Sequence, residues 1–181
     1  MKNLLYILLM LPALCYGQNF EVTPNGLRDS RDNEKTFLVI EISGTAKQLY
    51  DKAVKYINEK MASPKDAIKG QTEGEYLRYN THASNFINYN NSGAKIPISA
   101  DFATELKFKD GKVRYEITDL KMQGNKGYSI LYSGGVFDGY IIYKKNGTLF
   151  KEETKQDIEN YFNTEVKKFI NYLKSDKNDN W

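Results

Sequence analysis

The first half of the chain carries an apolar run followed by regularly spaced apolar positions. Phe37–Ile42 is compact and rich in β-branched residues, which predicts a buried strand. Ser43-Gly44-Thr45 interrupts it, and Ser43 or Thr45 can cap the element that follows. From Ala46 to Met61 the apolar residues recur every three or four positions. This spacing predicts an amphipathic helix, which ends before Ser63-Pro64.

The middle of the chain alternates apolar and polar residues, as antiparallel strands do. Two short strands, Ala67–Gly70 and Glu75–Asn80, flank a predicted turn. A clearer hairpin runs from Phe102 to Met122 about Asp110-Gly111, because both residues of a two-residue turn need a positive φ. Residues 83–100 are rich in asparagine and contain a proline, so we expect an irregular edge strand or a mobile loop there.

The two-residue turn fixes which side chains share a face of the hairpin. The apolar face carries Thr104, Leu106, Phe108, Val113, Tyr115 and Ile117. The charged face carries Glu105, Lys107, Lys109, Lys112, Arg114 and Glu116. Because like charges oppose each other there, we expect the diagonal pairs Glu105–Arg114 and Lys107–Glu116 to offset the repulsion. The sheet therefore has one packed face and one solvated face.

The last third of the chain predicts short strands and then a long helix. Residues 123–150 are rich in Gly and Tyr, with a predicted strand at Val136–Phe137 and a hairpin over Tyr140–Phe150 about Asn146-Gly147. From Glu152 to Lys174 the apolar residues form one helical stripe. The order predicts an α+β fold: an antiparallel sheet of about five or more strands, an N-terminal β-α unit and a long C-terminal helix packed on one face.

The first residues resemble an export signal. An apolar run, Leu4–Leu14, follows a basic start, and Cys15 and Gly17 are small residues at positions −3 and −1 of a cut before Gln18. Cys15 could instead carry a lipid anchor, but the bulky Leu14 before it disfavours this alternative. We expect an exported protein of the periplasm or cell envelope, with no transmembrane segment in the mature chain.

Composition adds limits rather than a function. The chain has 181 residues, a formal net charge of +3, one Cys and one His, so a Cys/His metal cluster or a Cys–His catalytic pair is hard to build. The charge is too small to predict a nucleic-acid partner. The predicted organisation is a signal peptide (1–17), a flexible leader (18–35), a single domain (36–174) and a polar tail (175–181).

Three segments resemble the DUF4468 family. They read FLVIEISGTAKQLYDKAVKYINEKM, AIKGQTEGEYLRY and ATELKFKDGKVRYEITDLKM, and together they cover residues 37–122. The hallmarks are a strand leading into a Tyr-containing helix, and a Lys-Asp-Gly hairpin followed by Arg-Tyr and Ile-Thr. The resemblance implies an exported bacterial domain of unknown function with a TBP-like fold. It implies no functional residues, since the shared motifs are structural, and it gives no reason to expect DNA binding.

Recognisable catalytic chemistry is scarce. His82, the single histidine, follows a predicted strand, and spacing alone identifies no Ser-His-Asp arrangement around it. We interpret it as a surface or strand-end residue. No calcium loop, zinc helix or phosphate loop is present in the sequence, so we predict no catalytic residue, metal site or cofactor. A pair of glycosidase carboxylates stays open, because such pairing is spatial.

Three surfaces could bind something. Lys107, Lys109, Lys112 and Arg114 could hold an anion or a lipid headgroup, but Glu105, Asp110 and Glu116 dilute the patch and favour a solvated sheet face. The candidate partner surface consists of Tyr128, Tyr132, Tyr140 and Tyr143. The preference of tyrosine for exposed positions in strands explains these residues equally well. The candidate lining of an apolar ligand cavity is Leu106, Tyr115 and Phe162, with a filled core favoured.

These features predict an exported, non-enzymatic binding or interaction module of the bacterial cell envelope, with an unknown protein or envelope partner. The alternative is a carrier of a small apolar ligand held between the sheet and the C-terminal helix. A hydrolase with an unrecognised site is the third possibility.

Overall fold

The computed structural model describes residues 18–124, 127–135 and 138–175. Its main sheet has five antiparallel strands in the order β3-β7-β6-β5-β4. The strands of this sheet are β3 (Phe37–Glu41), β4 (Ile68–Thr72), β5 (Tyr76–Asn91), β6 (Ala94–Lys109) and β7 (Lys112–Gly124). Smaller pairs are formed by β1 (Phe20–Thr23) with β2 (Gly26–Asp29), and by β8 (Ile130–Gly134) with β9 (Tyr140–Lys144). The helices are α1 (Ala46–Lys60), α2 (Pro64–Ala67) and α3 (Glu152–Lys174).

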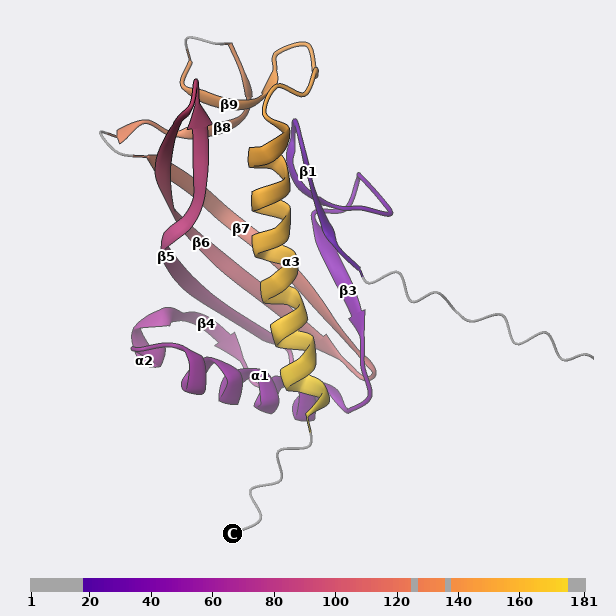
Figure 1. Cartoon of the computed structure of the whole chain (residues 1–181). Coiled ribbons are helices and arrows are strands. Elements are labelled where there is room, and N and C mark those ends of the chain that lie inside the picture. The colour runs from indigo at the N-terminus through magenta and orange to yellow at the C-terminus, as the bar shows by residue number, and fades with distance from the viewer. Residues whose placement is uncertain (1–17, 125–126, 136–137, 176–181) are drawn as a thin grey trace, which may run out of the picture.

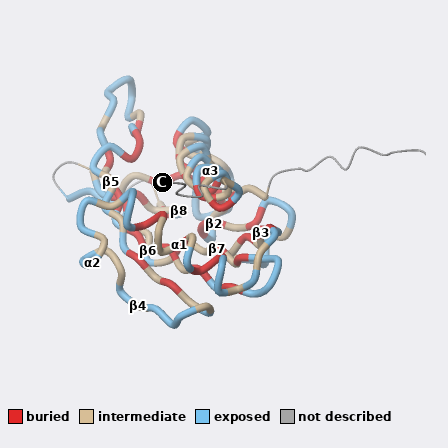
Figure 2. Tube along the Cα trace, turned by 90° about the horizontal axis from the view of Figure 1, so that it is seen from below, coloured by how far each residue is buried: buried red, intermediate tan, exposed pale blue. Residues whose placement is uncertain are grey.

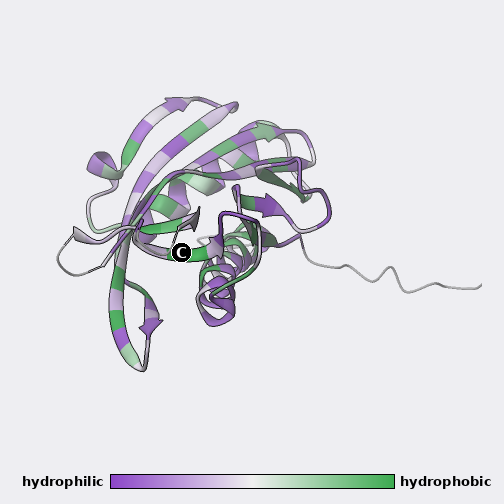
Figure 3. Cartoon of the chain, turned by 90° about the horizontal axis from the view of Figure 1, so that it is seen from above, coloured by the Kyte–Doolittle hydropathy of each residue, from purple (hydrophilic) through white to green (hydrophobic). Residues whose placement is uncertain are grey.

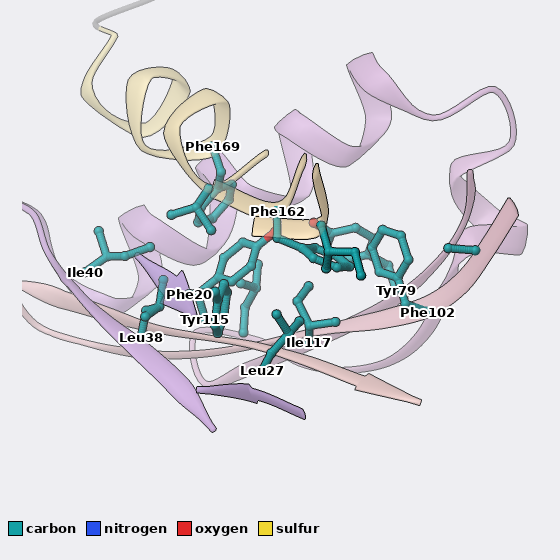
Figure 4. Packing of buried hydrophobic residues seen from close by; sticks show 14 of the residues in the cluster. Phe20, Leu27, Leu38, Ile40, Tyr79, Phe102, Tyr115, Ile117, Phe162 and Phe169 are labelled. Atoms are coloured by element: carbon teal, nitrogen blue, oxygen red, sulfur yellow. The ribbon is translucent and has the colours of Figure 1, made fainter. Parts of the chain in front are cut away.

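Two helices cover one face of the sheet, which we call the inner face. Figure 1 shows α3 running across this face and α1 lying at one end of it. Aromatic rings fill the space between the layers: Phe162 lies 5.2 Å from Phe102, and Phe169 lies 5.6 Å from Tyr115, between ring centroids. Figure 4 shows these side chains meeting between sheet and helix. The predicted β-α unit, antiparallel sheet and long covering helix are therefore confirmed.

The register predicted from the Asp110-Gly111 turn is confirmed. Leu106 pairs with Tyr115, Lys107 with Arg114 and Lys109 with Lys112. The residues of the predicted apolar face are buried, and Figure 2 shows buried and exposed positions alternating along the strands. The hydropathy of the strands alternates in the same way in Figure 3. The other face, which we call the outer face, is the solvated one.

The register places Glu105 diagonal to Arg114 and Lys107 diagonal to Glu116, as predicted, but neither diagonal forms an ion pair. Glu105 pairs instead with Arg78 of the neighbouring strand β5, at 2.6 Å. Arg114 pairs with Glu116, two residues along its own strand. Glu105, Arg114 and Glu116 lie on one face, as predicted. The sequence of the hairpin alone could not show that β5 places the guanidinium of Arg78 beside Glu105.

Helix α1 begins where its sequence predicts. Thr45 is its N-cap: the Gln48 amide donates to the Thr45 hydroxyl, and the Thr45 amide donates to the Gln48 side chain, which is a capping box. The Ala46 amide donates to Asp110 at 2.8 Å, so the hairpin turn also caps the helix. The proline at position 64 begins α2, and Ala67, predicted to begin a strand, ends this helix instead.

The flexible leader predicted for residues 18–35 is wrong. Strands β1 and β2 form a hairpin there, and Phe20, Val22 and Leu27 are buried. This hairpin docks on α3, because the Phe20 amide donates to the Asn163 side chain at 2.7 Å and the Asn163 amide donates back to the Phe20 carbonyl at 3.0 Å. A polar, turn-rich segment is thus ordered by a partner helix far along the chain.

Of the two alternatives predicted for residues 83–100, the irregular edge strand is confirmed in part, because β4 pairs with β5 only as far as Tyr79, and the mobile loop is wrong. Strands β5 and β6 continue through this segment as a long hairpin arm, with Ile87 opposite Ile98 and Asn91 opposite Ala94. The register shifts between residues 83 and 87. At the tip of the arm, Ser92 and Gly93 have φ values of 51° and 90°. The positive φ of Gly93 suits a residue without a Cβ.

The predicted hairpin about Asn146-Gly147 is confirmed over a short span. Tyr143 and Leu149 form an antiparallel bridge across the turn, and the Phe150 amide donates to the Ile142 carbonyl at 2.9 Å. The parallel pairing of β9 with β8 was not predicted. The strand predicted at Val136–Phe137, the predicted signal peptide (1–17) with Cys15, and positions 176–181 of the predicted polar tail lie outside the described residues.

The docking of the β1–β2 hairpin can be tested at Phe20, whose side chain is 2% exposed. Replacing Phe20 by Ala should lower the free energy of unfolding by about 3–4 kcal/mol, because a large buried ring is lost from the core. Urea denaturation followed by circular dichroism measures this change. The matched control is Asn25→Ala in the exposed turn of the same hairpin, with an expected change below about 0.5 kcal/mol. Equal stability of Phe20→Ala and the parent protein would contradict the docking of this hairpin and support the flexible leader predicted from the sequence.

Candidate functional site

The apolar cavity predicted between the sheet and the last helix is filled by side chains. Leu106, Tyr115 and Phe162 are all within 3% of complete burial and belong to one hydrophobic cluster. Tyr115 contacts the rings of Phe20 and Phe169, and the first of these comes from the hairpin that was not predicted. The structure thus brings the three predicted lining residues together, but as core.

The four tyrosines predicted as a partner surface divide into two groups. Tyr143 is buried and donates its hydroxyl to the Val22 carbonyl at 2.6 Å. Tyr132 is half-buried and lies against Gly26, and burial raises the pKa of its phenol. Tyr128 and Tyr140 remain near the surface, with their ring centroids 5.6 Å apart. The predicted surface is therefore reduced to one pair of rings.

His82 has an acidic partner that its spacing did not predict. Its Nδ1 lies 2.7 Å from Asp101 across the β5–β6 ladder. The pair lines a polar hollow of about 700 Å³ with side chains from α2, β4 and β7. Both side chains are well exposed, at 60% and 58%, and a polar contact between such exposed side chains contributes little to stability.

The four cations predicted on the charged sheet face do converge. They line a hollow of about 280 Å³ on the outer face of the sheet, which we call the basic hollow. The lining residues are Phe37, Val39, Lys107, Lys109, Lys112 and Arg114. Strand β3 supplies the two apolar residues, because Val39 pairs with Arg114 and Phe37 with Glu116.

The apolar floor orients Arg114. Its guanidinium carbon lies 3.8 Å from the centroid of the Phe37 ring, a cation–π contact. Glu116 accepts a hydrogen bond from the same guanidinium. Arg114 is thus held in place, whereas the three lysines have exposed side chains and no hydrogen bond or ion pair to any residue of the described part of the chain.

Two of the acidic residues expected to dilute this patch are bound outside it, whereas Glu116 is bound to one of its cations, Arg114. Glu105 accepts hydrogen bonds from Arg78 and Thr118, and Asp110 accepts one from the Ala46 amide. Glu116 bonds Thr36 as well as Arg114. Glu41 of β3 opposes Lys112, but the structure records no ion pair between them. The dilution predicted from the sequence is thus present at Arg114, through Glu116, while Glu105 and Asp110 bond residues outside the hollow.

Like charges oppose each other along the hollow. Lys109 lies across from Lys112, and Lys107 across from Arg114. Directly opposed like charges destabilise an antiparallel ladder. The fold thus keeps two cationic rows side by side, and a bound anion would relieve their repulsion.

The sequence did not predict three residues that shape this site. Phe37 and Val39 line the hollow, and Arg78 binds the carboxylate of Glu105. The alternation along Phe37–Ile42 places Phe37 and Val39 on one face of their strand. It does not show which other strand pairs with it. The pairing of β3 with β7 is a contact between distant segments, and the hairpin turn gives no information about it.

A groove of about 440 Å³ lies between α3 and the β5 arm. Burial there, with Glu153 nearby, raises the pKa of Asp157.

Among the described residues, no cluster of three or more His, Cys, Asp or Glu side chains is placed to hold a metal ion. None of the described helices is long and apolar enough to cross a membrane.

The fold is similar to one that has been solved. The crystal structure of a DUF4468 family protein from Bacteroides ovatus matches with a TM-score of 0.54 and 12% sequence identity, over 77% of this chain and 85% of that chain. No family model matches the sequence, and no curated protein matches it. At this identity the likeness shows the fold alone. The resemblance stated from the sequence segments is confirmed at that level: the chain has a DUF4468-like fold.

The repulsion within the basic hollow can be measured through stability. Replacing Lys109 by Glu puts an acid opposite Lys112, so the free energy of unfolding should rise by about 0.5 kcal/mol. Urea denaturation at low ionic strength measures the gain, which should shrink in high salt because the charges are screened. Lys167→Glu on α3 makes the same change of charge away from the hollow and should not stabilise. A loss of stability in both variants would contradict the repulsion.

Proposed function

We propose that this protein is an exported, non-enzymatic binding module of the bacterial cell envelope that binds a phosphate-bearing ligand in the basic hollow. One observation carries the proposal: four cationic side chains line a single hollow that has no carboxylate in its lining. A soluble phosphate compound and a phospholipid headgroup present the same chemistry to this site.

The type of cation supports a phosphate ligand. Lysine binds phosphate as a mobile point charge, and Lys107, Lys109 and Lys112 have exposed ammonium groups. Arg114, already held by Phe37 and Glu116, fixes the floor of the hollow. The volume of about 280 Å³ is small compared with pockets for drug-sized ligands, so it suits one or two charged groups.

The unfavourable pairing of cations across β6 and β7 also supports binding of an anion. A ladder selected for stability alone would place Glu opposite Lys, as cross-strand pairs prefer. Here the cations face one another, while Glu105 and Glu116 face each other in the next row. Sites that keep an unfavourable arrangement of charges are often functional.

Export and the absence of catalysis rest on the sequence. The apolar start with small residues before Gln18 supports export, and lipid attachment at Cys15 is the less favoured alternative. No catalytic motif accompanies the hollow, and His82 lies in a different one. The filled core around Phe162 gives no support to the alternative of an apolar-ligand carrier.

Binding can be tested by calorimetric titration of the purified protein. Inorganic phosphate and glycerol phosphate represent soluble ligands, and vesicles with or without phosphatidylglycerol represent headgroups. The double variant Lys109→Ala/Lys112→Ala should weaken binding roughly thirty-fold, at about 1 kcal/mol for each lysine. Affinity for the parent protein should fall as salt is added.

The control is Lys167→Ala/Lys168→Ala on α3, which makes the same change of net charge away from the hollow. Binding should be unchanged in this variant. Equal weakening in both double variants would reduce the effect to net charge and contradict a site. Binding only to vesicles would identify the headgroup as the source, and no binding to either class of ligand would overturn the proposal.

A further inference from the structure

A second hollow lies at the opposite end of β6 from the basic hollow. The basic hollow adjoins the β6–β7 turn, and this one adjoins the β5–β6 turn and the β8–β9 pair, near the upper end of the molecule in Figure 1. Its volume is about 250 Å³, and we call it the aromatic pocket. The lining residues used below are Tyr89, Asn91, Ser92, Tyr140, Phe150 and Lys151.

Aromatic rings form one side of this pocket. The rings of Tyr89 and Tyr140 lie 4.6 Å apart between centroids, with an angle of 30° between their planes. Tyr128 extends the row, 5.6 Å from Tyr140. Tyr128 and Phe150 are 54% and 43% exposed, and they are the exposed large hydrophobic side chains of the described residues. The exposed aromatic surface is therefore gathered at this end.

Polar groups form the other side. Asn91 and Ser92 at the turn of the arm have side chains that make no recorded hydrogen bond to a described residue. Lys151 donates to the Asn90 carbonyl at 2.8 Å, and its ammonium lies 5.2 Å and 5.1 Å from the ring centroids of Tyr89 and Phe150. The cation is thus fixed, while the amide and the hydroxyl are available as donors and acceptors.

We propose that the aromatic pocket binds one sugar unit of a glycan. A sugar ring has an apolar face of C–H groups, which can lie on a tyrosine ring, and an edge of hydroxyls that both donate and accept hydrogen bonds. Tyr140 and the exposed ring of Phe150 line the pocket and offer the first surface, and Asn91 with Ser92 offers the second. The small volume fits a single ring.

Other occupants fit less well. A purely apolar ligand would take water from Asn91 and Ser92 without replacing their hydrogen bonds, which is costly. A stable protein interface buries about 800 Å² on each partner, and two exposed rings around a small pocket offer little of this. This site does not depend on the basic hollow, so either proposal can fail alone.

The test is a saturation-transfer NMR screen of the purified protein with glucose, galactose, mannose, N-acetylglucosamine and their short oligomers. At least one sugar should bind, with the strongest transfer to protons on one face of its ring. Phe150→Ala removes an exposed ring that lines the pocket and is not part of the core, so the fold should persist. Affinity should fall roughly five-fold, which corresponds to the loss of one stacking contact.

Tyr76→Ala is the control, because Tyr76 is a partly exposed aromatic residue at the other end of β5. It should bind the same sugar as the parent protein does. No binding of any sugar in the screen at millimolar concentration would overturn the proposal, with circular dichroism showing that the protein is folded. Equal affinity of the parent and Phe150→Ala would also overturn it. Self-association lost in Phe150→Ala, with no sugar bound, would identify a protein interface instead.

Discussion

The packing of α3 on the inner face of the sheet determines what the rest of the molecule can do. Phe162 and Phe169 meet rings from β6 and β7, and Asn163 on the same helix holds the β1–β2 hairpin through the backbone of Phe20. Close packing of this kind leaves the inner face no room for a ligand. Among the described residues, the hollows that remain lie on the outer face, at the ends of the sheet and in the grooves beside the helices.

The outer face carries one of these, the basic hollow. Its carboxylates bond Arg78, Thr36, Arg114 and the start of α1, while Lys109 faces Lys112 across β6 and β7 with no acid between them in the ladder. The hairpin that creates the cationic rows also caps α1 through Asp110. The same turn thus serves the fold and shapes the basic hollow.

The sequence predicts the elements whose signals are local. Asp110-Gly111 gave the register of β6 with β7, and the apolar stripes gave α1 and α3. Features that depend on distant partners were missed. The segment around Phe20 is polar and turn-rich and is ordered only by α3, and Tyr143 is buried because its hydroxyl reaches Val22. The partner of Glu105 was missed for the same reason, since Arg78 lies on another strand.

The most direct test of this account is where a phosphate ion perturbs the protein. Amide ¹H–¹⁵N spectra of the labelled protein can be recorded with inorganic phosphate and with chloride at matched ionic strength. The account predicts that phosphate-specific shifts concentrate in residues 107–114 of the β6–β7 hairpin and in Phe37–Val39 of β3, while amides of α3 stay unchanged. Shifts scattered over the surface lysines, or identical spectra in the two salts, would contradict it.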